Sequence, residues 1–167
     1  MSWHNHVSGD HYTISEAWLD RVQEVLDYAV DDDMYVILNI HHDTDKEYCY
    51  PDKEHLEQSL SYMTFIWEQL ADRFGDYDEH VIFESINEPR LVETDHEWWL
   101  DMNAAECVEA VECINEWNQN FVDVVRKTGG NNATRYLMVP GYDASADGVL
   151  NDKFVLPTCL LYTSDAA

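Results

Sequence analysis

The stretch His80-Val-Ile-Phe-Glu-Ser-Ile-Asn-Glu-Pro89 decides how this chain folds. It begins as an apolar run, which predicts a strand mostly buried on both faces, and it ends abruptly in a polar tip. Proline cannot donate a hydrogen bond to a sheet and biases the preceding residue toward an extended conformation. Glu88 is therefore expected at the tip of the strand, beside Asn87. Parallel α/β folds present catalytic carboxylates in this way, although the start of a polar loop can have the same sequence pattern.

Apolar runs alternate with amphipathic segments along the rest of the chain. Strands are expected to end at Trp3-His6 and to lie over 34–40, 80–87 and 135–140, with helices from Thr13 to the acid run 31–33, from Leu56 to Gly75, and over about 105–128. Thr13 and Glu16 have capping-box spacing, and Gly75 is expected to close its helix in a left-handed conformation. Strict alternation of buried strands with helices predicts a parallel sheet covered by helices.

Polar residues follow every one of these strands, which is typical of the active-site face of an α/β barrel. A doubly wound sheet is the alternative, but no glycine-rich phosphate loop follows any strand. We therefore predict a (β/α)8 TIM barrel. The chain has 167 residues, short of the roughly 250 of a complete barrel, so we expect only about the end of strand 2 through strand 5. The barrel is expected over 1–157, and 158–167, where the sequence changes character, is interpreted as a non-native tail.

Charge and composition narrow the range of partners. The chain carries 9 basic and 34 acidic residues, which argues against nucleic acid and acidic membranes and fits a neutral substrate. No apolar run approaches the eighteen or so residues of a membrane span. The four cysteines show no zinc-type spacing, and their disulfide status stays open.

The predicted strand ends supply the candidate site residues. These are Trp3, His4, His6, His41, His42, Asp43, Asn87, Glu88, Tyr142 and Asp143. Such a set could serve metal-assisted hydrolysis, but the later strand ends offer no histidine or lysine ligand, so no metal and no cofactor are expected. Glycoside hydrolysis is favoured, because it uses a carboxylate pair with amides, imidazoles and aromatic walls around a sugar.

Four motifs resemble glycoside hydrolase family 5, especially its endoglucanase-type members. They are Trp3-His-Asn-His6, Asn39-Ile-His-His-Asp43, Phe83-Glu-Ser-Ile-Asn-Glu-Pro89 and Val139-Pro-Gly-Tyr142, within a match over about 1–157. The resemblance implies a retaining β-glycanase on a (β/α)8 barrel. It implies the following roles: Glu88 as general acid/base, Asn87 on the sugar 2-hydroxyl, His41 lining the cleavage subsite, and His42, His6, Trp3 and Tyr142 as further substrate contacts.

The chain also departs from the family pattern. The arginine expected upstream of the first motif is missing, as are strands six to eight with their tyrosine, histidine and nucleophilic glutamate. Glu84 cannot replace that glutamate, because four residues along a strand separate it from Glu88 by roughly 13 Å, whereas retaining chemistry needs about 5–5.5 Å. Asp43 and Asp143 stay open as second carboxylates. We expect the chain alone to be inactive.

The sequence therefore predicts part of an endo-β-1,4-glucanase that takes part in polysaccharide catabolism. Its partner is expected to be a β-glucan polysaccharide or oligosaccharide, with no nucleic acid and no membrane. The full-length protein is expected to be a monomer that is secreted or held at the cell surface. A non-catalytic carbohydrate-binding barrel is the alternative, followed by a metal-dependent barrel hydrolase.

Overall fold

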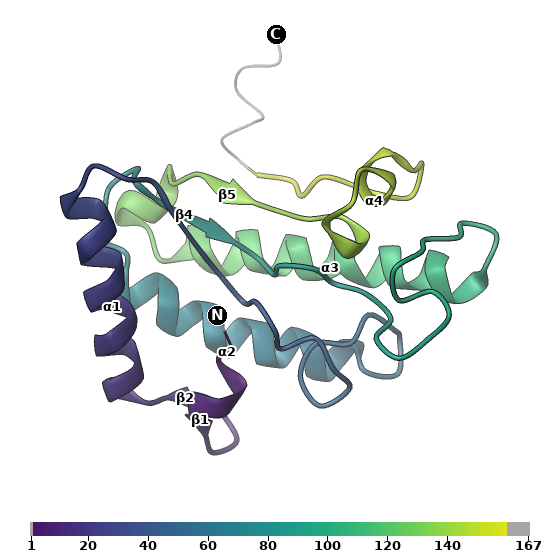
Figure 1. Ribbon diagram of the computed structural model, residues 1–167, viewed down its shortest axis with the longest axis horizontal. Helices are drawn as coiled ribbons and strands as arrows, with labels where there is room; N and C mark the ends of the chain where they lie inside the picture. The colour runs from purple at the N-terminus through teal and green to yellow at the C-terminus, as the bar shows by residue number, and fades with distance from the viewer. Residues whose placement is uncertain (1, 160–167) are drawn as a thin grey trace, which may run out of the picture.

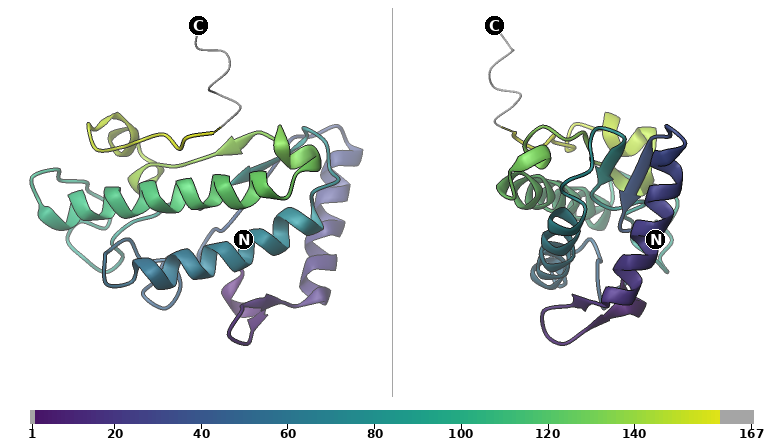
Figure 2. Two further views of the ribbon diagram at one scale, coloured as in Figure 1. Left: turned by 180° about the vertical axis from the view of Figure 1, so that it is seen from behind. Right: turned by 90° about the vertical axis from the view of Figure 1, so that its left-hand side faces the viewer.

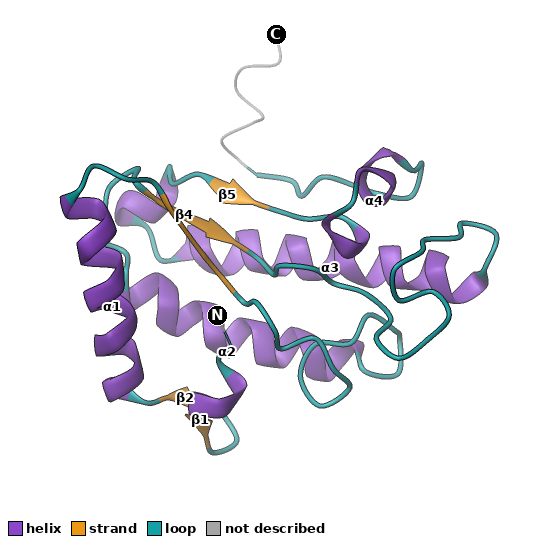
Figure 3. Ribbon diagram, viewed as in Figure 1, coloured by secondary structure: helices purple, strands orange, loops and turns teal. Residues whose placement is uncertain are grey.

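The computed structural model describes residues 2–159, and its centre is a parallel sheet of three strands in the order β3–β4–β5. The strands are β3 (Val36–Asn39), β4 (Val81–Glu84) and β5 (Leu137–Met138). Phe83 of the middle strand pairs with Leu38 on one side and Leu137 on the other, so the strands run in parallel register. The predicted parallel sheet is confirmed (Figures 1 and 3).

Helices alternate with the strands, as predicted. They are α1 (Glu16–Asp31), α2 (Leu56–Arg73), α3 (Ala105–Lys127) and the short α4 (Ala146–Leu150). The long helices α2 and α3 lie side by side and cover one face of the sheet, while α1 packs beside β3 (Figures 1 and 2). This arrangement is the strand–helix repeat of a barrel, opened at both sides of the described segment.

Aromatic side chains fill the layer between the sheet and the two long helices. The ring of Trp67 on α2 lies 5.3 Å from Phe83 of β4 and 4.6 Å from Phe121 of α3, measured between centroids. All three side chains are fully buried. Because alternate residues of a strand face opposite sides, burying Phe83 here turns Ile82 and Glu84 to the other face.

That other face of the sheet is open. Ile37 of β3 is 50% exposed and Met138 of β5 is 41% exposed, and no element of residues 2–159 covers them. On the central strand β4, Val81 and Phe83 are buried on the covered face, while Ile82 and Glu84 on the open face are half-buried. The expected burial of this strand is therefore complete on one face and partial on the other. In a (β/α)8 barrel this face points to the barrel interior, where opposite strands meet.

The N-terminal segment differs from its prediction. His4–His6 forms a 3-10 helix rather than the end of a strand, and it leads into an antiparallel pair of β1 (Val7–Ser8) and β2 (Thr13–Ile14). Since Thr13 is used in that pair, it cannot cap α1, and Ser15 is the N-cap residue instead, without a side-chain cap bond. Helix α1 itself is confirmed, with its N-cap two residues later than the capping box predicted.

Glycines follow the C-terminal ends of both long helices, α2 and α3. Gly129 and Gly130 follow α3 with φ of 70° and 55°, a conformation that favours glycine, so the predicted stop is confirmed. Gly75 after α2 has no positive φ, and the expected left-handed cap is wrong. A Cβ there would lie 2.7 Å from the carbonyl oxygen of Ala71, so close backbone approach requires glycine at this position.

The C-terminal part of the described chain runs along α3. Thr158 donates its backbone N–H to Gln119, and the buried Cys159 lies 3.4 Å from the Nε atom of Arg126. These two residues begin the segment 158–167 that we interpreted as a non-native tail, and its remainder, 160–167, lies outside the described residues. Within the described part, no helix combines the length and apolar character needed to cross a membrane.

Arg135 closes the end of the sheet opposite the predicted site. It is 4% exposed, and its guanidinium lies 4.6 Å from the centre of the Phe83 ring. Its hydrogen bonds all go to carbonyl oxygens, those of Phe74, Gly75, Tyr77, Asp78, Val81 and the Asn132 side chain. One buried cation therefore holds the whole α2–β4 connection.

We predict that Arg135→Lys lowers the free energy of unfolding by about 2–4 kcal/mol, because an ammonium group leaves several of these buried carbonyls without a donor. Urea denaturation measures the change. Arg21→Lys on the exposed face of α1 is the matched control and should stay within about 0.5 kcal/mol of wild type. Equal effects of the two substitutions would contradict the role given to Arg135.

Candidate active site

Backbone hydrogen bonds join the three strand ends into one rim. The N–H of Asn87 donates to the carbonyl of Ile40 at 2.8 Å, and the N–H of Asp143 donates to the carbonyl of Pro89 at 2.8 Å. The ladder thus continues past the regular strands and brings the residues after β3, β4 and β5 together. Glu88 lies in the middle of this rim, as predicted from the sequence.

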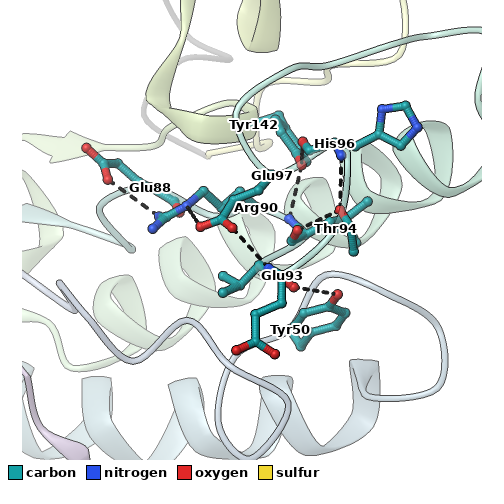
Figure 4. A network of polar contacts seen from close by, with 10 residues as sticks. Tyr50, Glu88, Arg90, Glu93, Thr94, His96, Glu97 and Tyr142 are labelled. Carbon is teal, nitrogen blue, oxygen red and sulfur yellow. Dashed lines mark hydrogen bonds and ion pairs between the residues drawn. The ribbon is translucent and has the colours of Figure 1, made fainter.

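Glu88 is the open carboxylate of the rim. Its side chain is 42% exposed, and its Oε2 lies 3.4 Å from Nη1 of Arg90 (Figure 4). The same Nη1 donates to the backbone carbonyl of Glu88 at 2.9 Å. A carboxylate that is accessible yet held on one side has the properties that proton transfer to a bound substrate requires.

Asp43 is a carboxylate with a different environment. It is fully buried and accepts hydrogen bonds from the backbone N–H of Trp3 at 2.9 Å and from the Tyr62 hydroxyl at 2.7 Å. The Nδ1 atom of His4 lies 2.6 Å from its other oxygen. These partners occupy its oxygens from three sides. Asp43 therefore has a structural role. Because it is buried and hydrogen-bonded in this way, it is no longer a candidate for the second catalytic carboxylate.

Glu84 has the partner that its inward position requires. The Asn39 side-chain amide on β3 donates to Oε2 of Glu84 at 2.7 Å, across the register pair that joins the two strands. Burial raises the pKa of Glu84, and the hydrogen bond from Asn39 opposes that shift. Burial thus makes ionisation of this carboxyl less favourable than it is for an exposed glutamate.

The predicted histidines fall into two groups. His41 and His42 follow β3, with ring centroids 4.4 Å apart in an edge-on arrangement, and His42 is exposed. Burial lowers the pKa of His41, His42 lowers it further, and the charge of Glu88 opposes the shift, which relates His41 electrostatically to Glu88. His6, in contrast, stacks on Trp18 of α1, with ring centroids 3.7 Å apart. This contact joins it to α1 and not to the residues after β4.

Trp3 and Tyr142 present no surface to a ligand in this structure, so their prediction as substrate contacts requires correction. Trp3 is 0% exposed and donates its indole N–H to the carbonyl of Asn39. Tyr142 is 1% exposed, donates its hydroxyl to the carbonyl of His96 at 2.6 Å and accepts from the N–H of Leu91 at 3.0 Å. Both aromatic residues instead fix the segments that carry the rim.

Arg90 is the site residue that the sequence analysis missed. It contacts Glu88 and Glu97 (Figure 4). Its guanidinium carbon also lies 4.0 Å from the ring centre of Trp98. The signal that could have found it is its charge: it directly follows the Asn-Glu-Pro tip in a chain with only 9 basic residues.

Ligand-type side chains come close together at one other place. Within the part of the chain that the structure describes, Asp52, Glu54 and His55 are the group whose oxygen and nitrogen atoms could converge on an ion. His55 and Asp52 already bond to each other at 2.7 Å at the start of α2. Among the described residues, Cys49, Cys107 and Cys113 are buried thiols that form no disulfide.

Comparisons with known proteins agree with this geometry. The family model described as Cellulase (glycosyl hydrolase family 5) matches residues 1–163. Endoglucanase B of Ruminococcus albus is 47% identical over 146 residues, which cover 87% of this chain. The structure of a family 5 lichenase from Caldicellulosiruptor sp. F32 superposes with a TM-score of 0.93 at 58% identity, over 95% of this chain. A broad-specificity endoglucanase from Ruminococcus champanellensis with bound cellotriose matches 96% of this chain with a TM-score of 0.87 at 48% identity.

The chain spans only part of these proteins. It covers 34% of the Ruminococcus albus endoglucanase, 42% of the lichenase chain and 44% of the Ruminococcus champanellensis chain. Together with the three parallel strands and their covering helices, these matches confirm the predicted fold as a segment of a TIM barrel.

We predict that Glu84→Gln stabilises this chain at pH 7 and that the gain shrinks as the pH falls. Burial raises the folded pKa of Glu84 above the ordinary value of 4.5, so the native state binds more protons than the unfolded state between these two values. The free energy of unfolding of the wild-type protein therefore falls as the pH rises through that window. The glutamine side chain of the Glu84→Gln variant does not titrate and keeps an acceptor for Asn39, so the variant shows no such fall.

Urea denaturation at pH 7 and pH 4 tests this, with Glu68→Gln on the exposed side of α2 as the matched control. A difference between wild type and the Glu84 variant that is constant with pH, or that grows in acid, would contradict the prediction.

Proposed function

The chain belongs to the cellulase family, glycosyl hydrolase family 5, and from that membership we propose that the whole protein is a retaining β-glycoside hydrolase, an endo-β-1,4-glucanase. Its substrate is a β-glucan polysaccharide or oligosaccharide. The observation that carries the proposal is the accessible carboxylate of Glu88 at the end of β4, directly after Asn87 and beside the β3 tip. The names of the relatives support it: they are endoglucanases, and one matched structure is a lichenase.

Glu88 acts as the general acid and then as the general base. Retaining hydrolysis proceeds in two steps, in which one carboxylate protonates the leaving oxygen and a second attacks the sugar carbon from the opposite side. In the second step the deprotonated Glu88 activates the water that releases the sugar. Asn87 binds the sugar 2-hydroxyl, His41 lines the cleavage subsite beside Glu88, and the exposed His42 is a further substrate contact.

Neither Asp43 nor Glu84 can supply the second carboxylate. Asp43 is buried and bound by its own donors. Glu84 is held by Asn39, and an extended chain would place it roughly 13 Å from Glu88, beyond the 5–5.5 Å that retaining chemistry requires. Asp143 is then the candidate left on the rim, whereas the family resemblance implies a nucleophilic glutamate from a part of the whole protein outside this chain.

The polymeric substrate also bears on location and assembly. A polysaccharide is too large to be taken up intact, so we propose that the whole protein is secreted or held at the cell surface. A single barrel contains both carboxylates of its own site, so it acts as a monomer. A non-catalytic carbohydrate-binding barrel is the second candidate, and it would lack a carboxylate opposite Glu88.

We predict that Glu88→Ala in the full-length protein lowers kcat/KM on natural β-glucan by about 10²–10⁴-fold. Substrates with acidic leaving groups need little protonation, so their kcat/KM should fall far less. Reducing-end and chromogenic assays measure the two substrates side by side. An equal loss on both would indicate that Glu88 is the nucleophile rather than the proton donor.

We also predict that purified 1–167 releases no more reducing ends from soluble β-glucan than its Glu88→Gln variant, because one carboxylate alone cannot complete the double displacement. Asp143 is the remaining candidate on the rim, and Asp143→Asn is the variant that tests it. Activity above the Glu88→Gln background that disappears in Asp143→Asn would show that Asp143 completes the site and would overturn the prediction.

A further inference from the structure

Arg90 contacts Glu88 at two points. Its Nη1 donates to the Glu88 backbone carbonyl at 2.9 Å and lies 3.4 Å from the Glu88 carboxylate. A single residue, Pro89, lies between Glu88 and Arg90 along the chain, and its ring restricts the backbone. The guanidinium thus holds both the position of the peptide group and the direction of the side chain (Figure 4).

The other side of the Arg90 guanidinium is held as well. Its Nε lies 3.4 Å from Oε1 of Glu97, and its Cζ lies 4.0 Å from the ring centre of Trp98. The side chain of Arg90 is 15% exposed, so these contacts are partly shielded from water. A planar fork can satisfy such a set of partners at once, whereas the single ammonium of lysine cannot.

The loop that carries Glu97 is itself fixed. The buried Tyr142 hydroxyl bonds the N–H of Leu91 and the carbonyl of His96, and the Tyr50 hydroxyl donates to the carbonyl of Val92 at 3.3 Å. Glu97 accepts a further bond from the N–H of Glu93 at 3.0 Å. Arg90 therefore links Glu88 to an anchored loop rather than to a free one (Figure 4).

Three carboxylates act on this single guanidinium. Burial raises the pKa of Asp143 on the β5 tip, Arg90 lowers it, and the charges of Glu88 and Glu97 raise it further. His41 after β3 is the further titratable group on which the charge of Glu88 acts, raising its pKa against the effect of burial. Without Arg90, the carboxylates of Glu88, Glu97 and Asp143 would repel one another with no cation between them.

We propose that Arg90 is a positioning residue for the proton donor: it holds the Glu88 carboxylate in place and balances the charges of Glu97 and Asp143 beside it. The proposal rests on the function proposed above. It assigns Arg90 to the protonation step, because the residue contacts the donor and not the sugar carbon.

The test compares Arg90→Gln, Glu97→Gln and wild type in the full-length protein. Misplacing the donor should lower kcat/KM of Arg90→Gln on β-glucan by about 10- to 100-fold, while an aryl glycoside with an acidic leaving group changes little. The alkaline limb of the kcat/KM profile reports loss of the donor's proton. It should move to higher pH in Arg90→Gln, where a cation is lost, and to lower pH in Glu97→Gln, where an anion is lost.

Opposite shifts of one limb cannot result from structural damage alone. Arg21→Gln on the exposed face of α1, whose side chain pairs with Glu24 of the same helix, is the control that should match wild type. Equal loss on both substrates, or an unmoved limb in both variants, overturns the positioning role while leaving the proposed function intact. If Arg90→Gln does not fold, the alkaline limb of the Glu97→Gln profile tests the proposal alone: a shift to lower pH supports it, and an unmoved limb overturns it. A wild-type protein inactive on both substrates overturns the proposed function and the donor role with it.

Discussion

The buried carboxylate of Asp43 is the interaction on which the site depends. An ionised group out of contact with water is costly unless its oxygens are occupied, and here the partners come from distant parts of the chain. Trp3 and His4 bring the N-terminal segment, and Tyr62 brings α2, to the end of β3. Because Asp43 directly follows His42, these bonds also fix where the two rim histidines leave the strand. The requirement to satisfy one charge thus assembles one side of the rim.

Three acidic residues of this rim and sheet show how burial assigns roles to the same chemistry. Asp43 is enclosed by donors and holds segments together, Glu84 is shared with Asn39 on the inner face of the sheet, and Glu88 remains accessible. Their residue type is nearly the same, but their surroundings differ in water, donors and charge. The catalytic assignment therefore rests on environment, and Arg90 is the part of that environment particular to Glu88.

The sequence predicted the elements of the fold well where periodicity is strong. The alternating strands and helices, the Gly129–Gly130 stop and the grouping of Glu88 with His41 follow from patterns that local physics enforces. It failed where a tertiary partner decides. Thr13 pairs with Ser8 instead of capping a helix, and Gly75 is needed for close approach rather than for its φ. Similarly, Trp3 and Tyr142 are motif residues, but only the fold reveals that their polar atoms point at backbone groups.

The Arg135 clamp has a consequence for how this protein responds to its surroundings. With 9 basic and 34 acidic residues, most of its surface electrostatics must change with acidity and with dissolved salt. The partners of Arg135 are carbonyl dipoles, which neither titrate nor attract a shell of counterions, and the guanidinium is shielded from both. The hydrogen bonds of Arg135 therefore do not themselves depend on ionic conditions, and charge acts on this clamp only through neighbours such as Asp78 and Arg126. The opposite rim is built of carboxylates and imidazoles, so its own contacts respond directly.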